Sequence, residues 1–203
     1  MNFPELPFSA ACERNKEPIL RVLTEHLADA ESVLEIGSGT GQHAEYFAKH
    51  LPHLVWYPSD REEYLSGLVR RFELANLANV QPPYRLDVNQ SPWFKNDIGF
   101  DAIYTANTFH IMREDEVVRV FQNLDGLLSP CGQLFVYGPF KYDGVFTSAS
   151  NQQFNQQLRA RGYGSGIREF HWICQLATSA RLSLAADIAM PVNNQCLVFE
   201  RSK

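Results

Sequence analysis

The sequence has few cysteines and no long apolar run. Only four of its 203 residues are cysteines, and their spacing matches neither a Cys-x-x-Cys pattern nor a Cys/His metal site. We therefore expect four reduced thiols in a cytoplasmic protein, with no metal. No window holds about 20 consecutive apolar residues, so we expect no membrane-spanning helix and no membrane partner.

Positive charge is also scarce. Eighteen Lys and Arg residues stand against 23 Asp and Glu residues, the formal net charge is −5, and no long basic run occurs. A groove that follows a nucleic-acid backbone needs a basic face, so a long nucleic acid is not expected as a partner. The first residues lack the basic-then-apolar layout of a signal peptide. The oligomeric state has no signature in the sequence.

What the sequence does contain is an alternation of strand-like and helical patterns. With 203 residues and 45% apolar residues, it suits one α/β domain over residues 1–203, beginning with a helical segment at 1–30. Such alternation predicts a largely parallel sheet covered by helices. The expected strands are 33–36, 54–57, a weak one ending at 86–88, 100–105 and 133–137, with helices between them at 44–51, 65–72 and 117–128.

The last third of the chain is less regular. Apolar periodicity fades over residues 138–163, although Ser150 and Asn151 suit the start of a short helix. Connections this long are usually functional or disordered, so we expect an insertion that covers the substrate. A helix follows at 170–177, and the apolar stretches 182–190 and 195–201 are joined by a link that suits only an antiparallel hairpin.

A glycine-rich turn follows the first expected strand. The run Glu35-Ile36-Gly37-Ser38-Gly39-Thr40-Gly41 gives a strand, a turn and a helix, an arrangement that lets backbone approach a nucleotide cofactor. The spacing is G-x-G-x-G rather than the G-x-G-x-x-G of dinucleotide-binding proteins. An NAD-dependent oxidoreductase is therefore disfavoured.

This run resembles the first motif of class I S-adenosylmethionine-dependent methyltransferases. The resemblance extends in order along most of the chain, and it implies a seven-stranded Rossmann-like sheet with strand order 3-2-1-4-5-7-6 and strand 7 antiparallel. It also implies roles for polar residues at strand ends. Asp60 would bind the ribose hydroxyls, Asp87 with Val88 the adenine, and Glu35, Gly37, Gly39, Asn15, Ala106 and Asn107 the remainder of the cofactor.

A closer resemblance is to the small, stand-alone methyltransferase-like twenty-six family. It is carried by residues 11–16, the run Gly-Ser-Gly-Thr-Gly-Gln-His at 37–43, and the segments 58–60, 137–140, 150–151 and 190–194. This resemblance implies the same fold and cofactor, but it implies no methyl acceptor.

Each of these site assignments has a structural alternative. Asp60 and Asp87 would also serve as helix or turn caps, and Glu35 as a hydrogen-bond acceptor within the turn. His110 follows the fourth strand, where it would orient an acceptor or remove its proton; a buried histidine bonded to backbone is the alternative. Asn151 and Asn194 are further acceptor-side candidates, and asparagine is also a common turn former.

The function expected from the sequence is methyl transfer from S-adenosylmethionine to an acceptor. Little positive charge is concentrated anywhere, so the expected partner is a small-molecule substrate, and a protein side chain is the open alternative. No Ser/His/Asp or Cys/His constellation occurs, and methyl transfer needs none, because the enzyme mainly aligns the reactants. A protein that binds the cofactor without transferring methyl groups, as a scaffold or sensor, would have the same motifs.

Overall fold

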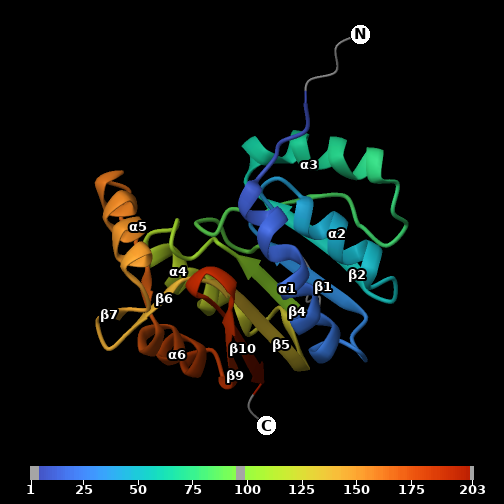
Figure 1. The fold of residues 1–203 in the computed structure, drawn as a ribbon. Coiled ribbons are helices and arrows are strands. Elements are labelled where there is room, and N and C mark those ends of the chain that lie inside the picture. Colours follow the sequence, from blue (N-terminus) through green and yellow to red (C-terminus); the bar gives the residue numbers. More distant parts are fainter. Residues whose placement is uncertain (1–4, 95–98, 202–203) are drawn as a thin grey trace. The chain divides into compact units, whose positions relative to one another are not determined.

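The computed structural model describes residues 5–94 and 99–201, and it has an α/β fold. The main sheet has seven strands in the order β3-β2-β1-β4-β5-β10-β9 (Figure 1). β10 is antiparallel to both of its neighbours, whereas β1 with β2, β2 with β3, and β4 with β5 are parallel. Counted within this sheet, the strands follow the predicted order, and the predicted antiparallel seventh strand is confirmed.

The chain divides into two compact units, and each is described in turn. The first is residues 1–87, of which residues 1–4 of the predicted N-terminal segment lie outside the described residues. Ser9 caps its first helix by accepting a hydrogen bond from the Cys12 amide. The elements of this unit are α1 (Ala10–His26), β1 (Ser32–Ile36), α2 (Gln42–His50), β2 (Val55–Asp60), α3 (Glu62–Ala75) and β3 (Tyr84–Arg85).

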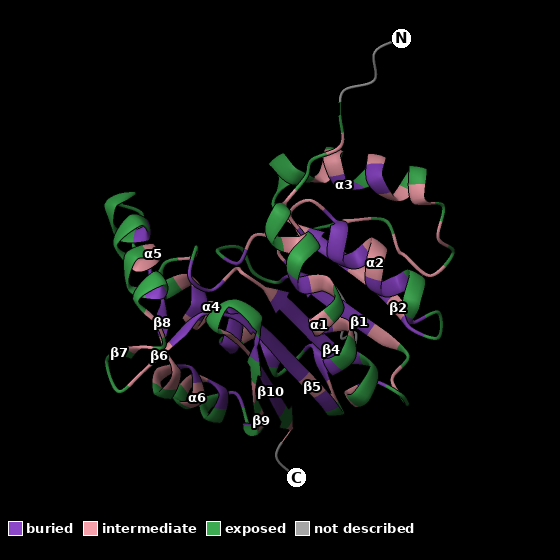
Figure 2. Cartoon of the chain, viewed as in Figure 1, coloured by how far each residue is buried: buried purple, intermediate pink, exposed green. Residues whose placement is uncertain are grey.

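The second unit begins at Val88 and contains the remaining elements. Its central strands β4 and β5 are buried over most of their length (Figure 2), which agrees with the apolar runs 102–104 and 134–137 within them. The elements are β4 (Phe100–Ala106), α4 (Glu114–Leu124), β5 (Leu128–Gly138), β6 (Phe140–Tyr142), β7 (Val145–Phe146), α5 (Ala149–Ala160), β8 (Arg168–Glu169), α6 (Phe170–Ser179), β9 (Leu182–Met190), a 3-10 turn (Pro191–Asn193) and β10 (Asn194–Arg201).

Residues 138–163, where the apolar periodicity of the sequence is weak, contain more regular secondary structure than the sequence indicates. They contain β6, β7 and α5, and the small sheet β7-β6-β8 includes their two strands. Helix α5 starts two residues earlier than the sequence indicates, with Ser148 rather than Ser150 as its cap. Only Asn151 and Leu158 are buried among the residues of α5, so the helix has almost no apolar stripe for a periodicity argument to detect.

Two further features concern the described residues as a whole. No helix among them is both long and apolar enough to cross a bilayer. Within the same residues, no group of three or more His, Cys, Asp or Glu side chains is placed to hold a metal ion.

Candidate functional site

The glycine-rich turn connects β1 to α2 in the first unit. Its glycines Gly37, Gly39 and Gly41 all have positive φ, at 77°, 55° and 75°. A Cβ at Gly41 would lie 2.9 Å from side-chain atoms of Leu68 and Arg71, whereas a Cβ at Gly39 would meet no described atom within 4 Å. The absence of a side chain at Gly41 therefore lets the turn pack closely against α3. At Gly39 it leaves the backbone accessible to a ligand.

Asp60, the last residue of β2, lies beside this turn. Its Oδ2 accepts a hydrogen bond from the Gly39 amide at 2.6 Å, and its Oδ1 accepts one from the Arg61 amide at 2.8 Å. Burial raises the pKa of Asp60, and the two backbone amides act in the opposite direction. Each carboxylate oxygen keeps a further lone pair, so the group is suited to accept hydrogen bonds from two neighbouring hydroxyls.

Glu35 is a buried carboxyl group directly before the turn. Only 2% of its surface is exposed, and its Oε2 accepts hydrogen bonds from Ser38 Oγ at 2.8 Å and Trp56 Nε1 at 3.1 Å. Burial raises the pKa of Glu35 to about 7, although the two hydrogen bonds lower it. The negative charge of Asp60 also raises this pKa. A cationic group bound close by would therefore favour the ionised form.

Asn15 joins α1 to α2 through a buried contact with His43. The distance from His43 Nε2 to Asn15 Oδ1 is 2.7 Å, and burial lowers the pKa of His43 to about 4. The imidazole also has a hydrogen bond with the Cys12 backbone, and its tautomer decides whether Nε2 donates to Asn15 or accepts from it. Gln42 adds a second connection by accepting a hydrogen bond from the Ser9 amide and donating one to Glu13.

Asp87 follows β3 near the same end of the sheet as Asp60. The amide of Leu86 donates to the Asp60 carbonyl at 2.8 Å, which continues the β2–β3 pairing up to the residue before Asp87. The first unit therefore brings together Glu35, Gly39 and Asp60, with Asn15 against His43 of the helix that follows the turn and Asp87 beyond the end of the neighbouring strand. Val88, which begins the second unit, is buried.

In the second unit, the candidates Ala106 and Asn107 lie at the end of β4. Asn107 has φ of +57°, and its amide donates to the Tyr137 carbonyl at 2.9 Å. The backbone then turns sharply, because the amides of Ile111 and Met112 both donate to the Thr108 carbonyl. His110 lies within this turn.

His110 is 6% exposed, and its ring packs edge-on against Phe154 of α5 with a centroid separation of 5.3 Å. A Cβ at Gly138 would lie 3.6 Å from its Nδ1. Among the described residues, neither ring nitrogen has a hydrogen-bond partner, so the alternative of a histidine bonded to backbone does not apply there. Burial lowers the pKa of His110 to about 4, with a further contribution from the positive charges of Arg168 and Arg161.

Asn151 and Asn194 have local partners instead. Asn151 Nδ2 donates to the Asn193 carbonyl and to Thr147 Oγ1, both at 2.9 Å, so its two amide hydrogens are used. Asn194 Nδ2 donates to the Pro191 carbonyl at 3.4 Å. Both side chains thus support the β9–β10 turn, and in the described part of this unit no hydrogen bond joins either of them to His110.

Sequence reasoning missed two buried arginines that support these candidates. Arg71 of α3 donates to the Thr40 carbonyl in the glycine turn at 2.5 Å and to the Pro7 carbonyl at 2.7 Å. Arg168 contacts the turn that carries His110. Arg71 lies three residues after Leu68, on the apolar side of its helix, and this spacing could have indicated that it is buried. No comparable spacing in the sequence indicates that Arg168 is buried.

These elements define a Rossmann-like methyltransferase fold, and solved structures bear this out. An O-methyltransferase family protein from Burkholderia thailandensis superimposes with a TM-score of 0.82 at 18% identity, over 95% of this chain and 58% of its own. Mitomycin 7-O-methyltransferase gives 0.79 at 16% identity, over 95% and 56%. Human N-acetylserotonin methyltransferase, solved in complex with SAM, gives 0.79 at 13% identity, over 95% and 53%.

These identities establish the fold alone, and this chain spans a little more than half the length of each of these structures. The family is established by sequence. Residues 6–201 match the model of the family described as "Protein of unknown function (DUF938)", and the chain belongs to that family.

Proposed function

We propose that this chain is an S-adenosylmethionine-dependent methyltransferase that acts on a hydroxyl group of a small molecule. The observation that carries the proposal is the open backbone at Gly39, flanked by the carboxylate of Asp60. The similarity to O-methyltransferases, two of them named for small molecules, supports the acceptor class. We also propose that residues 1–203 act as one domain, related to the methyltransferase-like twenty-six family, in which residues 138–163 cover the acceptor.

The residues of the first unit fit the cofactor. The free lone pairs of Asp60 suit the two ribose hydroxyls, and Asp87, followed by the apolar Val88, suits the adenine. Asn15 and Glu35 suit the amino-acid end, where a positive amino group would favour ionised Glu35. Gly39 leaves its backbone accessible, and Gly37, Ala106 and Asn107 are assigned to the cofactor by the resemblance. When bound, S-adenosylmethionine supplies a methyl group activated by its sulfonium.

His110 is the acceptor-side residue that the geometry favours. A hydroxyl must lose its proton as its oxygen becomes methylated, and a neutral imidazole with an unpartnered nitrogen is able to accept that proton. Asn151 and Asn194 act indirectly in this proposal. They fix the turn between β9 and β10 and the start of α5, the helix against which His110 packs.

Transfer of a labelled methyl group from the cofactor to a panel of hydroxylated metabolites tests this function. We expect a labelled product with the wild type, and at least a hundredfold slower formation, on the order of a lost general base, with His110→Gln. His171→Gln, an exposed histidine of the same unit, is the control. Binding of S-adenosylhomocysteine without product from any hydroxylated compound would contradict the transferase and favour the scaffold or sensor.

A further inference from the structure

The turn that carries His110 is held by four consecutive carbonyl groups. The Phe109 carbonyl accepts a hydrogen bond from Arg168 Nε at 3.0 Å, and the His110 carbonyl accepts one from the Gly166 amide at 2.9 Å. The Ile111 carbonyl accepts one from Ser165 Oγ at 2.6 Å, and the Met112 carbonyl accepts one from Arg168 Nη2. Every donor lies in the four-residue segment 165–168.

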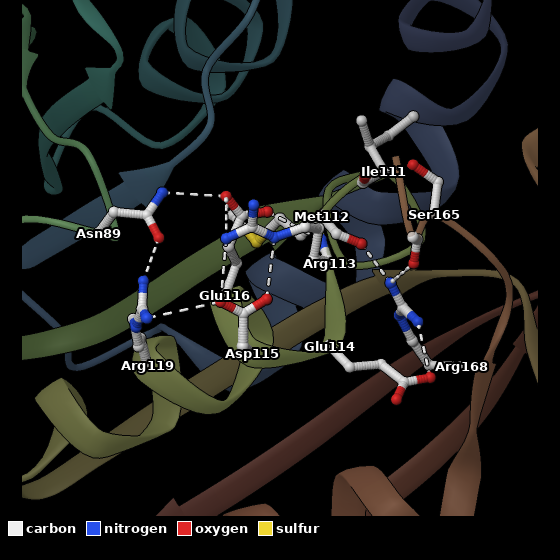
Figure 3. Close-up of polar contacts among 11 residues, drawn as sticks. Asn89, Ile111, Met112, Arg113, Glu114, Asp115, Glu116, Arg119, Ser165 and Arg168 are labelled. Carbon is white, nitrogen blue, oxygen red and sulfur yellow. Dashed lines mark hydrogen bonds and ion pairs between the residues drawn. The ribbon is translucent and has the colours of Figure 1, made fainter. Parts of the chain in front are cut away.

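Arg168 is the centre of this arrangement. Its side chain is 2% exposed, and Nη2 also donates to the Gly164 carbonyl at 3.1 Å (Figure 3 shows its contacts with Met112 and Glu114). The carboxylate of Glu114, 3.3 Å from Nη1, is 66% exposed and therefore a weak partner. Burying a guanidinium is costly unless its donors are used, so the backbone carbonyls are its main compensation.

A second Arg cluster in the same view provides a contrast. Arg119 contacts Asp115 and Asn89 at the surface of α4, and it donates to none of the four carbonyls (Figure 3). Loss of Arg119 would remove a positive charge and an exposed ion pair while leaving the His110 turn intact.

We propose that Arg168 is a positioning residue, which fixes residues 109–112 and thereby holds the His110 ring over Gly138 and against Phe154. This proposal rests on the proposed function only in treating His110 as the proton acceptor. The guanidinium also opposes a second positive charge on the imidazole. Arg161, which follows α5, acts in the same direction, and Glu114 offsets part of the charge of Arg168.

Three variants distinguish the effect of Arg168 on the position of the His110 turn from the effect of its positive charge. Arg168→Lys keeps the charge, but one ammonium group is not able to reproduce the planar fork that reaches three carbonyls. Arg168→Gln removes both charge and fork. Ser165→Ala removes only the hydrogen bond to Ile111 and guards against a failure of the arginine variants to fold. Arg119→Gln is the control for loss of a nearby arginine.

The test measures the imidazole titration of His110 by NMR and the hydrogen exchange of the Gly166, Ile111 and Met112 amides. The His110 signal is identified by its loss in His110→Gln. Arg168→Gln should raise the pKa of His110 toward its ordinary value of about 6.5. Arg168→Lys should raise it less, and both should speed the amide exchange about tenfold. Ser165→Ala should speed exchange at the turn alone, and Arg119→Gln should change neither quantity.

Unchanged exchange and an unchanged His110 titration in both Arg168→Lys and Ser165→Ala would overturn the proposal. Neither measurement needs a methyl acceptor. If the protein transfers no methyl group, the proposed function fails while Arg168 is still tested. If it does transfer one, a positioning role predicts a lower kcat for Arg168→Lys with an unchanged affinity for S-adenosylhomocysteine.

Discussion

Burial decides which single residues carry a proton in this protein. Glu35 has its pKa raised to about 7, whereas His43 and His110 have theirs lowered to about 4, and burial is the main cause in all three. Each shift makes stability depend on pH. The two histidines contribute stability above pH 6.5 that is lost as the pH falls through about 4, because protonation must then occur in a buried site.

Glu35 acts with the opposite sign. Its pKa in the folded state lies above the ordinary 4.5, so its contribution is fully present below pH 4.5 and is lost as the pH rises through about 7. Glu35→Gln keeps an oxygen to accept from Ser38 and Trp56 but cannot ionise. Relative to wild type, it should gain up to about 3 kcal/mol in free energy of unfolding between pH 5 and pH 8.

Urea unfolding at the two pH values measures this difference. Glu25→Gln, at an exposed position of α1, should unfold with the same pH dependence as the wild type. If Glu35→Gln and Glu25→Gln gave the same dependence, Glu35 would not be a neutral carboxyl group at pH 5 and an ionised one at pH 8.

The glycine turn between β1 and α2 both packs against α3 and leaves backbone open to a ligand, and single substitutions distinguish these two roles. Gly41→Ala should lower the free energy of unfolding by about 2 kcal/mol or more, because its Cβ would overlap Leu68 and Arg71 and its φ is +75°. Gly39→Val should leave a folded protein with some strain at φ of +55° and abolish binding of S-adenosylhomocysteine. Thermal melting and calorimetry distinguish them, and tight binding by folded Gly39→Val would show that this turn does not cradle the cofactor.

The contact between α5 and the β9–β10 turn supplies another prediction. Val192 and Asn193 both have positive φ, at 61° and 58°, which is costly for a β-branched residue. Asn151 compensates by donating to the Asn193 carbonyl. Asn151→Ala should therefore cost about 1–2 kcal/mol of stability, whereas Gln152→Ala, its exposed neighbour, should cost far less. Equal unfolding midpoints for the two variants would contradict a supporting role for Asn151.

For the molecule as a whole, the sequence predicted the main sheet because its central strands β1, β4 and β5 are largely buried. Predominantly apolar runs such as 33–36 and 100–105 indicate such strands, and the short final link requires an antiparallel pair. The sequence also indicated Gly39, in the turn after β1, and Asp60, at the end of β2. It missed Arg168 because the two turn carbonyls that this side chain binds, those of Phe109 and Met112, are more than 50 residues away, and no local pattern encodes a contact of that range.

The role of Asn151 shows the same limit. A polar residue in a loop-like sequence fits both an acceptor contact and a turn, and only the three-dimensional partner at Asn193 distinguishes them. The sequence indicated only the start of α5, near Ser150 and Asn151, because this helix buries so little apolar surface that its length has no periodic signal.

Calorimetry with S-adenosylhomocysteine tests most directly whether the first unit binds the cofactor through Asp60. We expect saturable binding by the wild type, at least about tenfold weaker binding by Asp60→Ala, and wild-type binding by Asp29→Ala at an exposed position. No binding by the folded wild type, or equal affinity in folded Asp60→Ala, would contradict it.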